Sequence, residues 1–312
     1  FFNEIQHQKV SQITPIFNVD RPLGLDYGGL EAVSRDVDGV VEMVLDATQR
    51  YTDGLTNERL CAWQAALSPT GRSGLLAVQV GHYRKHGEGD PMQVVSGGFG
   101  RPRVHFQAPE SDVVPNEMGK FLTGLNGLLD NEDSILKAAI AHLWFLTIHP
   151  FGGGNGRVAR AITDMILARS DESKYRFYSM SAAILADKKG YYQVLEMTQK
   201  DDLEITEWLL WFLSTLEVAL TSSEELMERT LVKARFWHQH TETSLNERQK
   251  KMLNKVLDGF KGNLTSSKWA KIAKVSQDTA GRDIKDLIDK KVLVPAPDGG
   301  RSTHYLLFGS TA

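Results

Sequence analysis

Apolar residues recur at intervals of three and four positions along most of the chain. This spacing places them on one face of an α-helix, so it predicts amphipathic helices. The segments that show it are "DGVVEMVLDATQRY", "TNERLCAWQAAL", "VVPNEMGKFLTGLNGLL", "SILKAAIAHLWFLTIH", "GRVARAITDMILARS", "KGYYQVLEMTQK" and "ITEWLLWFLSTLEVALTSSEELMERTLVKARFW". The chain is therefore predicted to be mainly helical as far as Trp237.

One interval has a different pattern. Two short β-prone runs, Met92–Ser96 and Arg103–Gln107, flank the turn sequence "GGFGRP", which predicts a β-hairpin or flap over residues 92–107. An isolated two-stranded ribbon is only marginally stable in water. We therefore expect this flap to pack against another element or to await a strand from a partner.

The pattern changes after Trp237. A basic amphipathic helix is predicted in "TETSLNERQKKMLNKVL", followed by two helices that begin at Ser/Thr caps, "LTSSKWAKIAKV" and "SQDTAGRDIKDLIDKKV". The segment "LVPAPDGGRSTHYLLF" then reads as strand, glycine-rich turn and strand. Helix, turn, helix and hairpin in this order are the layout of a winged helix-turn-helix.

The composition is that of a globular protein able to bury a core, with 312 residues, 41% of them hydrophobic and 24% charged. No apolar run reaches the ~18 residues of a membrane helix, and the first residues, "FFNEIQHQKV", are too polar for a signal peptide. We expect a cytoplasmic protein with no membrane partner. The single cysteine, Cys61, excludes an internal disulfide and a cysteine-rich zinc site, and is predicted to be a small core residue.

The net charge of −3 hides an uneven distribution. Residues 230–312 contain 15 Lys and Arg against 8 Asp and Glu, whereas residues 1–229 contain 21 against 31. This asymmetry favours two modules, of which the second is better suited to a polyanion.

The stretch Thr147–Arg160, "TIHPFGGGNGRVAR", combines several flexible glycines with side chains that can bind an anion. A mostly buried helix, Ser134–Ile148, delivers His149 to its C-terminal end. Pro150 cannot continue the helix, and the glycines that follow permit a sharp turn before the next helix opens at Gly156. The free N–H groups of that turn, with the positive end of the new helix, predict a phosphate seat.

Three side chains add chemistry to this turn. Arg157 and Arg160 lie on one side of the helix and can present planar donor forks to phosphate oxygens, which implies more than one phosphate. His149 can act as a general base because imidazole is largely neutral at cellular pH. The glycines alone favour a simpler interpretation, namely a tight helix connection, and only the combination outweighs it.

The combination resembles the signature of the Fic family, His-Pro-Phe-x-Asp/Glu-Gly-Asn-Gly-Arg-x-x-Arg. The matching residues are His149, Pro150, Phe151, Gly154, Asn155, Gly156, Arg157 and Arg160. The helical body, the flap, "VGHYR", "GYYQVLEMTQKDDLEITEWLLWFL" and the tail also resemble large bacterial Fic proteins. The resemblance implies a mainly α fold: a Fic-type helical bundle with a β-hairpin flap, followed by a winged helix-turn-helix domain.

The resemblance also implies an enzyme that transfers AMP from ATP to a Tyr, Thr or Ser hydroxyl of a target protein or of itself. His149 would deprotonate the hydroxyl. The turn would cradle the α- and β-phosphates, with Arg157 on the β-phosphate and Arg160 on the γ-phosphate. Phe151 would anchor the loop, and the flap 92–107 would pair with an extended target segment. The nucleotide-binding set is Gly152, Gly153, Gly154, Asn155, Gly156, Arg157 and Arg160, with Tyr191 or Tyr192 at the adenine.

Two departures from the family pattern bear on activity. Gly153 stands where the family has the acid that binds Mg²⁺, so no metal ligand is predicted here and Mg²⁺, usual in the family, is doubtful for this chain. Many relatives also have an inhibitory N-terminal helix whose glutamate pairs with the second arginine. Gln6 is the aligned residue here and Glu4 serves only in a shifted register, so we expect weakened autoinhibition.

Several alternatives stay open. The chain is an active adenylyltransferase, or an ATP-binding, catalytically impaired regulator that acts through the tail. In the tail, cations on two predicted helices and in the wing can meet phosphates, but the helix that carries Arg282 and Lys285 also carries four aspartates, so the partner there is either DNA or a protein. A homodimer and removal of AMP are also left open. The cations are Lys268, Lys271, Lys274, Arg282, Lys285 and Arg301, and the aspartates are Asp278, Asp283, Asp286 and Asp289.

We divide the chain into a remnant of the N-terminal inhibitory region (1–30), a Fic catalytic domain (31–229) and a winged helix-turn-helix domain (230–312).

Overall fold

The computed structural model describes residues 35–73, 76–77, 79–85, 91–96, 103–128, 133–200, 204–260, 262–297 and 303–309. The inhibitory candidates Glu4 and Gln6, and Arg301 of the tail, lie outside the described residues.

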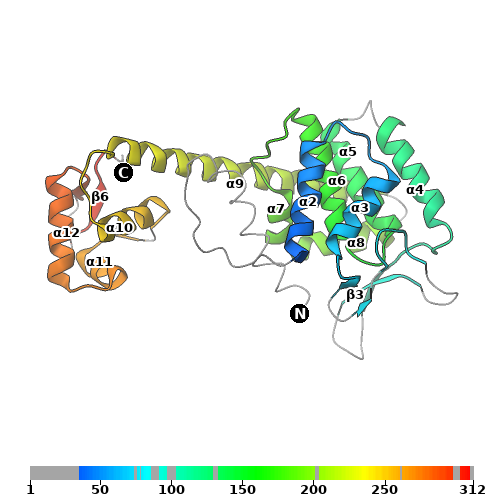
Figure 1. Ribbon diagram of the computed structural model, residues 1–312, viewed down its shortest axis with the longest axis horizontal. Coiled ribbons are helices and arrows are strands. Elements are labelled where there is room, and N and C mark those ends of the chain that lie inside the picture. The colour runs from blue at the N-terminus through cyan, green and yellow to red at the C-terminus, as the bar shows by residue number, and fades with distance from the viewer. Residues whose placement is uncertain are drawn as a thin grey trace. The chain divides into compact units, whose positions relative to one another are not determined.

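The chain divides into two compact units, Phe1–Ser223 and Glu224–Ala312, and the division falls inside helix α9 (Thr206–Gln239). Each unit has its own cluster of buried apolar residues. Figure 1 labels the elements along the chain. Within the described ranges, no helix combines the length and apolar character that crossing a membrane requires.

The first unit is mainly helical, as predicted. Its helices before α9 are α2 (Arg35–Gln49), α3 (Asn57–Leu67), α4 (Val114–Thr123), α5 (Ser134–Ile148), α6 (Asn155–Ser170), α7 (Met180–Ala186) and α8 (Lys188–Lys200). A short π-helical segment, Gly124–Leu128, extends α4. Side chains of Thr56, Asp133 and Ser179 accept hydrogen bonds from the first backbone N–H groups of α3, α5 and α7, which explains where these helices begin. The short helix α7 was not predicted.

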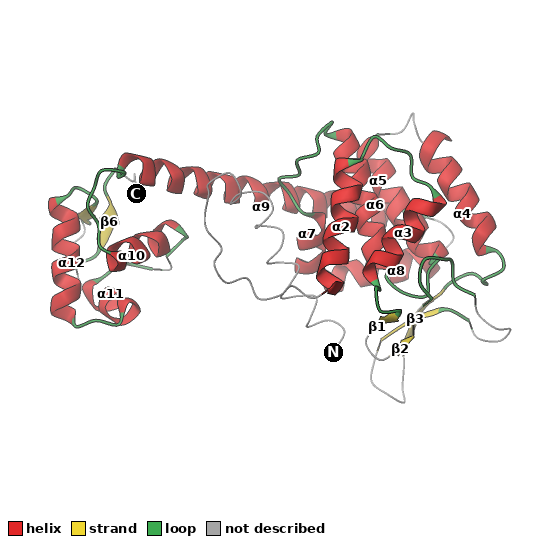
Figure 2. Ribbon diagram, viewed as in Figure 1, coloured by secondary structure: helices red, strands yellow, loops and turns green. Residues whose placement is uncertain are grey.

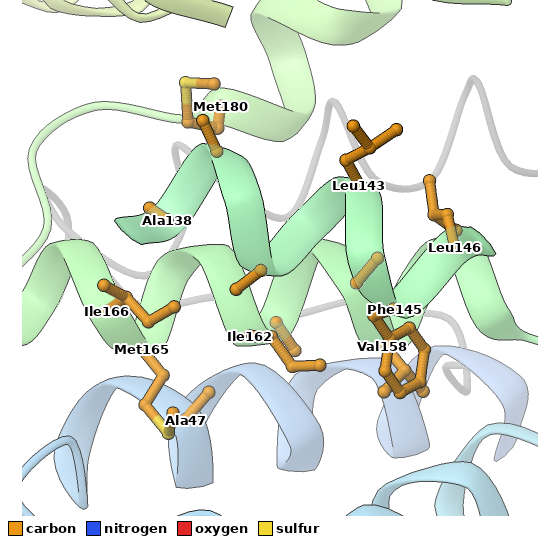
Figure 3. Packing of buried hydrophobic residues seen from close by; sticks show 14 of the residues in the cluster. Ala47, Ala138, Leu143, Phe145, Leu146, Val158, Ile162, Met165, Ile166 and Met180 are labelled. Atoms are coloured by element: carbon orange, nitrogen blue, oxygen red, sulfur yellow. The ribbon is translucent and has the colours of Figure 1, made fainter. Parts of the chain in front are cut away.

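Helices α5 and α6 form the centre of this unit. Figure 3 shows Phe145 of α5 beside Val158 of α6, with α2 packed below, where Met165 of α6 approaches Ala47. Helix α9 also packs against this centre. Its Trp208 is fully buried and donates its indole N–H to the carbonyl of Ala139 in α5 at 2.8 Å. The turn between α5 and α6 is therefore held by two helices with little freedom to move.

The strands of the first unit form two antiparallel pairs, visible beside the helices in Figure 2. The pair β3 (Gln93–Ser96) and β4 (Arg103–Gln107) confirms the predicted hairpin, with a register irregularity between Val94 and Val95. The pair β1 (Arg72–Ser73) and β2 (Leu76–Ala77) was not predicted, because two residues per strand give no detectable alternation.

The second unit contains the predicted helices and hairpin in the predicted order. They are α10 (Glu247–Leu257), α11 (Ser266–Ala273), α12 (Gln277–Asp289), β5 (Leu293–Pro295) and β6 (Tyr305–Leu307), with β5 and β6 antiparallel. Trp269 and Leu253 are fully buried at the centre of this unit.

Candidate functional site

The turn between α5 and α6 is bounded by two residues in the left-handed backbone conformation. His149 ends α5 with φ 51° and donates its N–H to the carbonyl of Phe145 at 2.9 Å. Gly154 precedes α6 with φ 84°. The left-handed conformation is free for glycine but costs roughly 1 kcal/mol or more for histidine. Pro150 then prevents α5 from continuing, so the chain reverses direction within the turn.

The half-buried ring of His149 has a defined tautomer. Its Nδ1 lies 3.2 Å from the carbonyl oxygen of Leu146. A carbonyl can only accept, so Nδ1 carries the hydrogen and Nε2 keeps a lone pair. Burial is the largest cause that lowers the pKa of His149; with the opposing effect of the Leu146 carbonyl and the smaller lowering effect of the nearby Arg84 cation, the pKa is about 4. At neutral pH the ring is therefore uncharged, with Nε2 available as a base.

Arg84 holds the end of α5 in place. It is only 2% exposed, and its guanidinium donates to the carbonyls of His149 at 2.8 Å, Pro109 and, more weakly, Ile148 at 3.4 Å. Its own backbone N–H donates to the carbonyl of Pro150 at 2.9 Å. These carbonyls have no helical partners, and a cation at a helix C-terminus is also favoured by the helix dipole.

Sequence reasoning missed this role of Arg84. The only signal was an arginine within "VGHYR", a segment noted for its resemblance alone.

The interior of the turn is shaped by Phe151 and Asn155. Phe151 is fully buried, with its ring centroid 5.6 Å from that of Tyr83, which confirms the predicted anchor. The buried amide of Asn155 accepts from the N–H of Phe151 at 3.0 Å and donates to the carbonyl of Phe151 at 2.7 Å. The side chain of Asn155 thus closes the loop on itself, and its contact with a phosphate stays a prediction.

The start of α6 carries unused donors and two cations. Among the described residues, the N–H groups of Asn155 and Gly156 have no backbone acceptor, as expected at a helix N-terminus. A Cβ placed on Gly154 would lie 3.9 Å from Nη2 of Arg157, and one placed on Gly156 would lie 3.7 Å from Nη1 of Arg160. Both guanidinium groups therefore lie against the backbone of the turn, which makes this surface suited to an anion.

The two tyrosine candidates on α8 have different environments. Tyr191 is 5% exposed, and its hydroxyl lies 3.0 Å from Nε2 of His142, while Nδ1 of His142 lies 2.8 Å from the hydroxyl of Thr163. Thr163 donates to the carbonyl of Ala159, so it accepts from His142, and Tyr191 donates to the remaining nitrogen.

Burial lowers the pKa of His142 to about 3, with an added effect of the Arg160 cation, so this network is uncharged. Tyr192, by contrast, is 48% exposed and has an accessible ring. Contact of either tyrosine with adenine stays a prediction.

The hairpin β3–β4 is tied to α8 through one carboxylate. Glu196 accepts from Nη2 of Arg103 at 2.9 Å, from Nδ1 of His105 and from Nζ of Lys200 at 2.7 Å. Hydrogen bonds from Lys200, His105 and Arg103, in that order, lower the pKa of Glu196 to about 2. The flap therefore packs on the helix that carries Tyr191 and Tyr192, which was one of the two expected outcomes.

The donor set around the turn does not fit a metal ion held by the protein. The groups at the turn are backbone N–H groups, guanidinium groups and an imidazole, whereas Mg²⁺ requires oxygen ligands. Gly153, which is partly exposed, supplies no side-chain oxygen. Nor does any cluster of three or more His, Cys, Asp or Glu suited to a metal occur within the described residues.

Cys61 is partly buried against the core, and burial raises the pKa of its thiol, which is therefore protonated at neutral pH.

Comparisons with known proteins agree with the motif. Residues 54–167 match the Fic/DOC family. Two proteins named protein adenylyltransferase fic-1, from Caenorhabditis briggsae and Caenorhabditis elegans, are each 31% identical to this chain over 124 residues. Each match covers 35% of this chain and 24% of the relative, so the chain spans about a quarter of the length of the curated relatives it matches.

Two solved structures are also similar. A Fic family protein from Desulfovibrio desulfuricans has 20% identity and a TM-score of 0.49, with 91% of this chain and 78% of the other covered. A Fic domain containing signaling protein from Bacteroides thetaiotaomicron has 21% identity and a TM-score of 0.47, with 63% and 74% covered.

The family match includes all of α5, the turn and the first three turns of α6, which are the elements that carry the motif residues His149 to Arg160. Residues 54–167 of the chain are therefore a Fic/DOC family domain.

Proposed function

We propose that this protein is a protein adenylyltransferase, which transfers AMP from ATP to a Tyr, Thr or Ser hydroxyl of a target protein or of itself. The single observation that supports the proposal is the neutral Nε2 of His149 at a turn whose other groups, backbone N–H donors and two guanidinium groups, are suited to an anion. The names of the nematode relatives support the same reaction.

In the proposed reaction the target hydroxyl oxygen attacks the α-phosphorus of ATP. The hydroxyl proton passes to Nε2 of His149, the bond between the α-phosphorus and the bridging oxygen breaks, and pyrophosphate leaves with the electron pair. The N–H groups of Asn155 and Gly156 hold the phosphates near the bond that forms, Arg157 holds the β-phosphate, and Arg160 holds the γ-phosphate. Donors fixed before the reaction stabilise the developing charge without reorganising.

We expect the rate of AMP transfer to be limited because Gly153 has no acidic side chain. In the family the acid at this position binds Mg²⁺, and here the arginines and the helix start must neutralise the leaving pyrophosphate without a metal held by the protein. We therefore expect ATP to bind and the transfer to be slow compared with that of a variant with an acid at this position.

The proposed target site is the hairpin β3–β4, over residues 92–107. A two-stranded sheet leaves the outer backbone groups of each strand for an added strand, and such pairing needs no particular target sequence. Val95 and Val104, which are 52% and 40% exposed, offer apolar contacts to alternate side chains of the added segment. The tie to Glu196 holds this hairpin on α8, which supports a preformed site.

A second candidate is an ATP-binding regulator that transfers nothing and acts through the second unit. The observation that favours it is Gly153, because the loss of the motif acid removes a catalytic group without disturbing the donors that bind phosphate. ATP would then serve as a signal rather than as a substrate.

One experiment separates the two candidates. The full chain is incubated with ATP, with and without Mg²⁺, and its intact mass is measured. An adenylyltransferase that modifies itself gains the mass of one AMP, and His149→Ala, the matched control, gains none; one that modifies only a target transfers radiolabel from ATP to a protein of a cell lysate, and His149→Ala does not. A regulator binds ATP by calorimetry and gains no mass, while Gly153→Asp restores transfer. Absence of ATP binding in the wild type would contradict both candidates.

A further inference from the structure

The second unit has a helix whose outward face is polar and charged. Helix α12 buries Ala280, Ile284 and Leu287, spaced as one face of a helix, in the core around Trp269. Its opposite face is exposed and carries Asp278, Arg282, Lys285 and Asp289. A Cβ placed on Gly281 would meet nothing within 4 Å, so this part of the face opens to solvent.

Two of the four aspartates on α12 are paired with cations of the same unit. Asp283 is 5% exposed and accepts from both Nε and Nη2 of Arg248, at 3.0 and 3.1 Å. Burial alone would raise the pKa of Asp283, but the hydrogen bonds from Arg248 and Asn246 outweigh it and lower the pKa. Asp286 accepts from Lys290 and from Gln249 of α10, which lower its pKa.

These two acids hold α12 on α10 and add no unpaired negative charge to the outer face. Of the four predicted aspartates, these two are therefore paired within the unit, whereas Asp278 and Asp289 lie exposed on the outer face.

The outer face retains its cations. In the described part of the unit, neither Arg282 nor Lys285 forms an ion pair; Arg282 donates only to a carbonyl, that of Asp278. The neighbouring helix α11 adds exposed cations at spacings of three, Lys268, Lys271 and Lys274. Lys274 ends α11 in the left-handed conformation, φ 54°, and only Val275 and the capping Ser276 separate it from α12. A tight turn therefore connects the helix that carries Lys274 to the helix that carries Arg282 and Lys285.

The chemistry of this face favours a polyanion over a protein. Protein interfaces have cores enriched in aromatic and large apolar residues. In the described residues of the unit, the exposed large apolar side chains are on α9 and at Phe308, and none is on α10, α11 or α12. An α-helix fits the major groove of duplex DNA, and α12, with 13 residues, is roughly 20 Å long, enough to cross it.

We propose that the outer face of α12 binds duplex DNA in the major groove, and that Lys271 and Lys274 contact the flanking phosphates. Gln277 and Arg282, on the first turns of α12, are placed to reach base edges, because an amide matches adenine and a guanidinium matches guanine. Gly281 between them lets the helix backbone approach the bases. This function is independent of adenylyl transfer.

The test measures binding of the full chain to a fluorescein-labelled mixed-sequence 30-bp duplex by anisotropy, from 50 to 200 mM KCl. Phosphate contacts by Lys271 and Lys274, together with the exposed Lys268 and Lys285 beside them, would number four and predict a slope of log K against log[salt] of about −3 to −4, or roughly a 10²-fold loss of affinity over this range. Lys271→Ala/Lys274→Ala should make the slope shallower by about 2. Arg282→Ala should reduce the preference for the sequences that the wild type selects from a random pool.

Lys251→Ala/Lys255→Ala on α10 is the matched control, because it removes the same charge from another helix of the unit. Its slope should equal that of the wild type. His149→Ala should bind DNA normally, so failure of this test would not bear on adenylyl transfer. Absence of binding at 50 mM KCl, an affinity that does not depend on salt, or an equal loss in the α10 variant would overturn the proposal.

Discussion

Replacement of Arg84 by methionine tests whether this arginine fixes the candidate base. Methionine has a similar length and no donors, so Arg84→Met leaves the partly buried carbonyls of His149 and Pro109 without the donors that they have in the wild type. An unsatisfied buried polar group costs roughly 1–3 kcal/mol. Two such groups, with the weaker contact to Ile148, predict a loss of about 2–5 kcal/mol in the free energy of unfolding. This is a large part of the ~5–15 kcal/mol typical of a folded domain.

The same substitution changes the titration of His149. The Arg84 cation disfavours the protonated imidazole, so its removal should raise the pKa of His149 above about 4, while burial keeps it below the usual value of 6.5. Transfer, which needs the neutral ring, should then decline at a higher pH as the solution is acidified. Arg84→Lys keeps the charge and loses the forked geometry, so it should leave the pKa low and still reduce stability.

The assays are urea unfolding and an NMR titration of the His149 ring, which does not require activity. Arg50→Met is the matched control, because the Arg50 side chain is 62% exposed and its surface ion pairs with Asp46 and Asp53 contribute little to stability. The reasoning would be refuted if Arg84→Met cost no more than Arg50→Met, or if the pKa of His149 failed to rise.

Three further substitutions test the surroundings of the turn. His142→Gln should flatten the dependence of stability on pH. The folded pKa of about 3 lies below the unfolded value, so the stability of the wild type falls as the pH drops from about 6.5. The free energy of unfolding in urea should therefore differ less between pH 7 and pH 5 in the variant than in the wild type. Tyr191→Phe removes the donor to His142 and should cost about 1 kcal/mol in unfolding, with ATP affinity by calorimetry unchanged; a large loss of affinity with normal stability would contradict this. Glu196→Gln should release the flap, seen as faster proteolysis within residues 91–107 and a raised KM for a target peptide, whereas equal proteolysis would show that the ion pairs do not hold it.

The sequence was sufficient to predict the turn, because its signals are local. Pro150 stops one helix, the glycines permit the reversal, and Arg157 and Arg160 follow at helical spacing. Arg84 could not be predicted, since its partner His149 is 65 residues away and the match depends on packing. The tie between Arg103 and Glu196 spans 93 residues and was missed for the same reason.

The burial of Tyr191 and the exposure of Tyr192 could have been predicted from the pattern. Tyr191, Val194, Leu195 and Thr198 are all buried and lie at the three and four spacing of one helix face, to which Tyr192 does not belong. In the tail, the sequence gives the number of aspartates on α12 and not their partners. Only the packing of α10 on α12 shows that Asp283 is buried against Arg248 and that Asp286 accepts from Gln249.

At His149 the left-handed backbone lowers the stability of the fold, whereas the side chain at the same position supplies the proposed base. Glycine would relieve the strain of that conformation, by roughly 1 kcal/mol, and would abolish the imidazole. A search for heat-resistant variants that ignored catalysis would therefore be expected to replace this histidine early. Retention of the ring in such a search would mean that its contact with Leu146 outweighs the strain of the backbone.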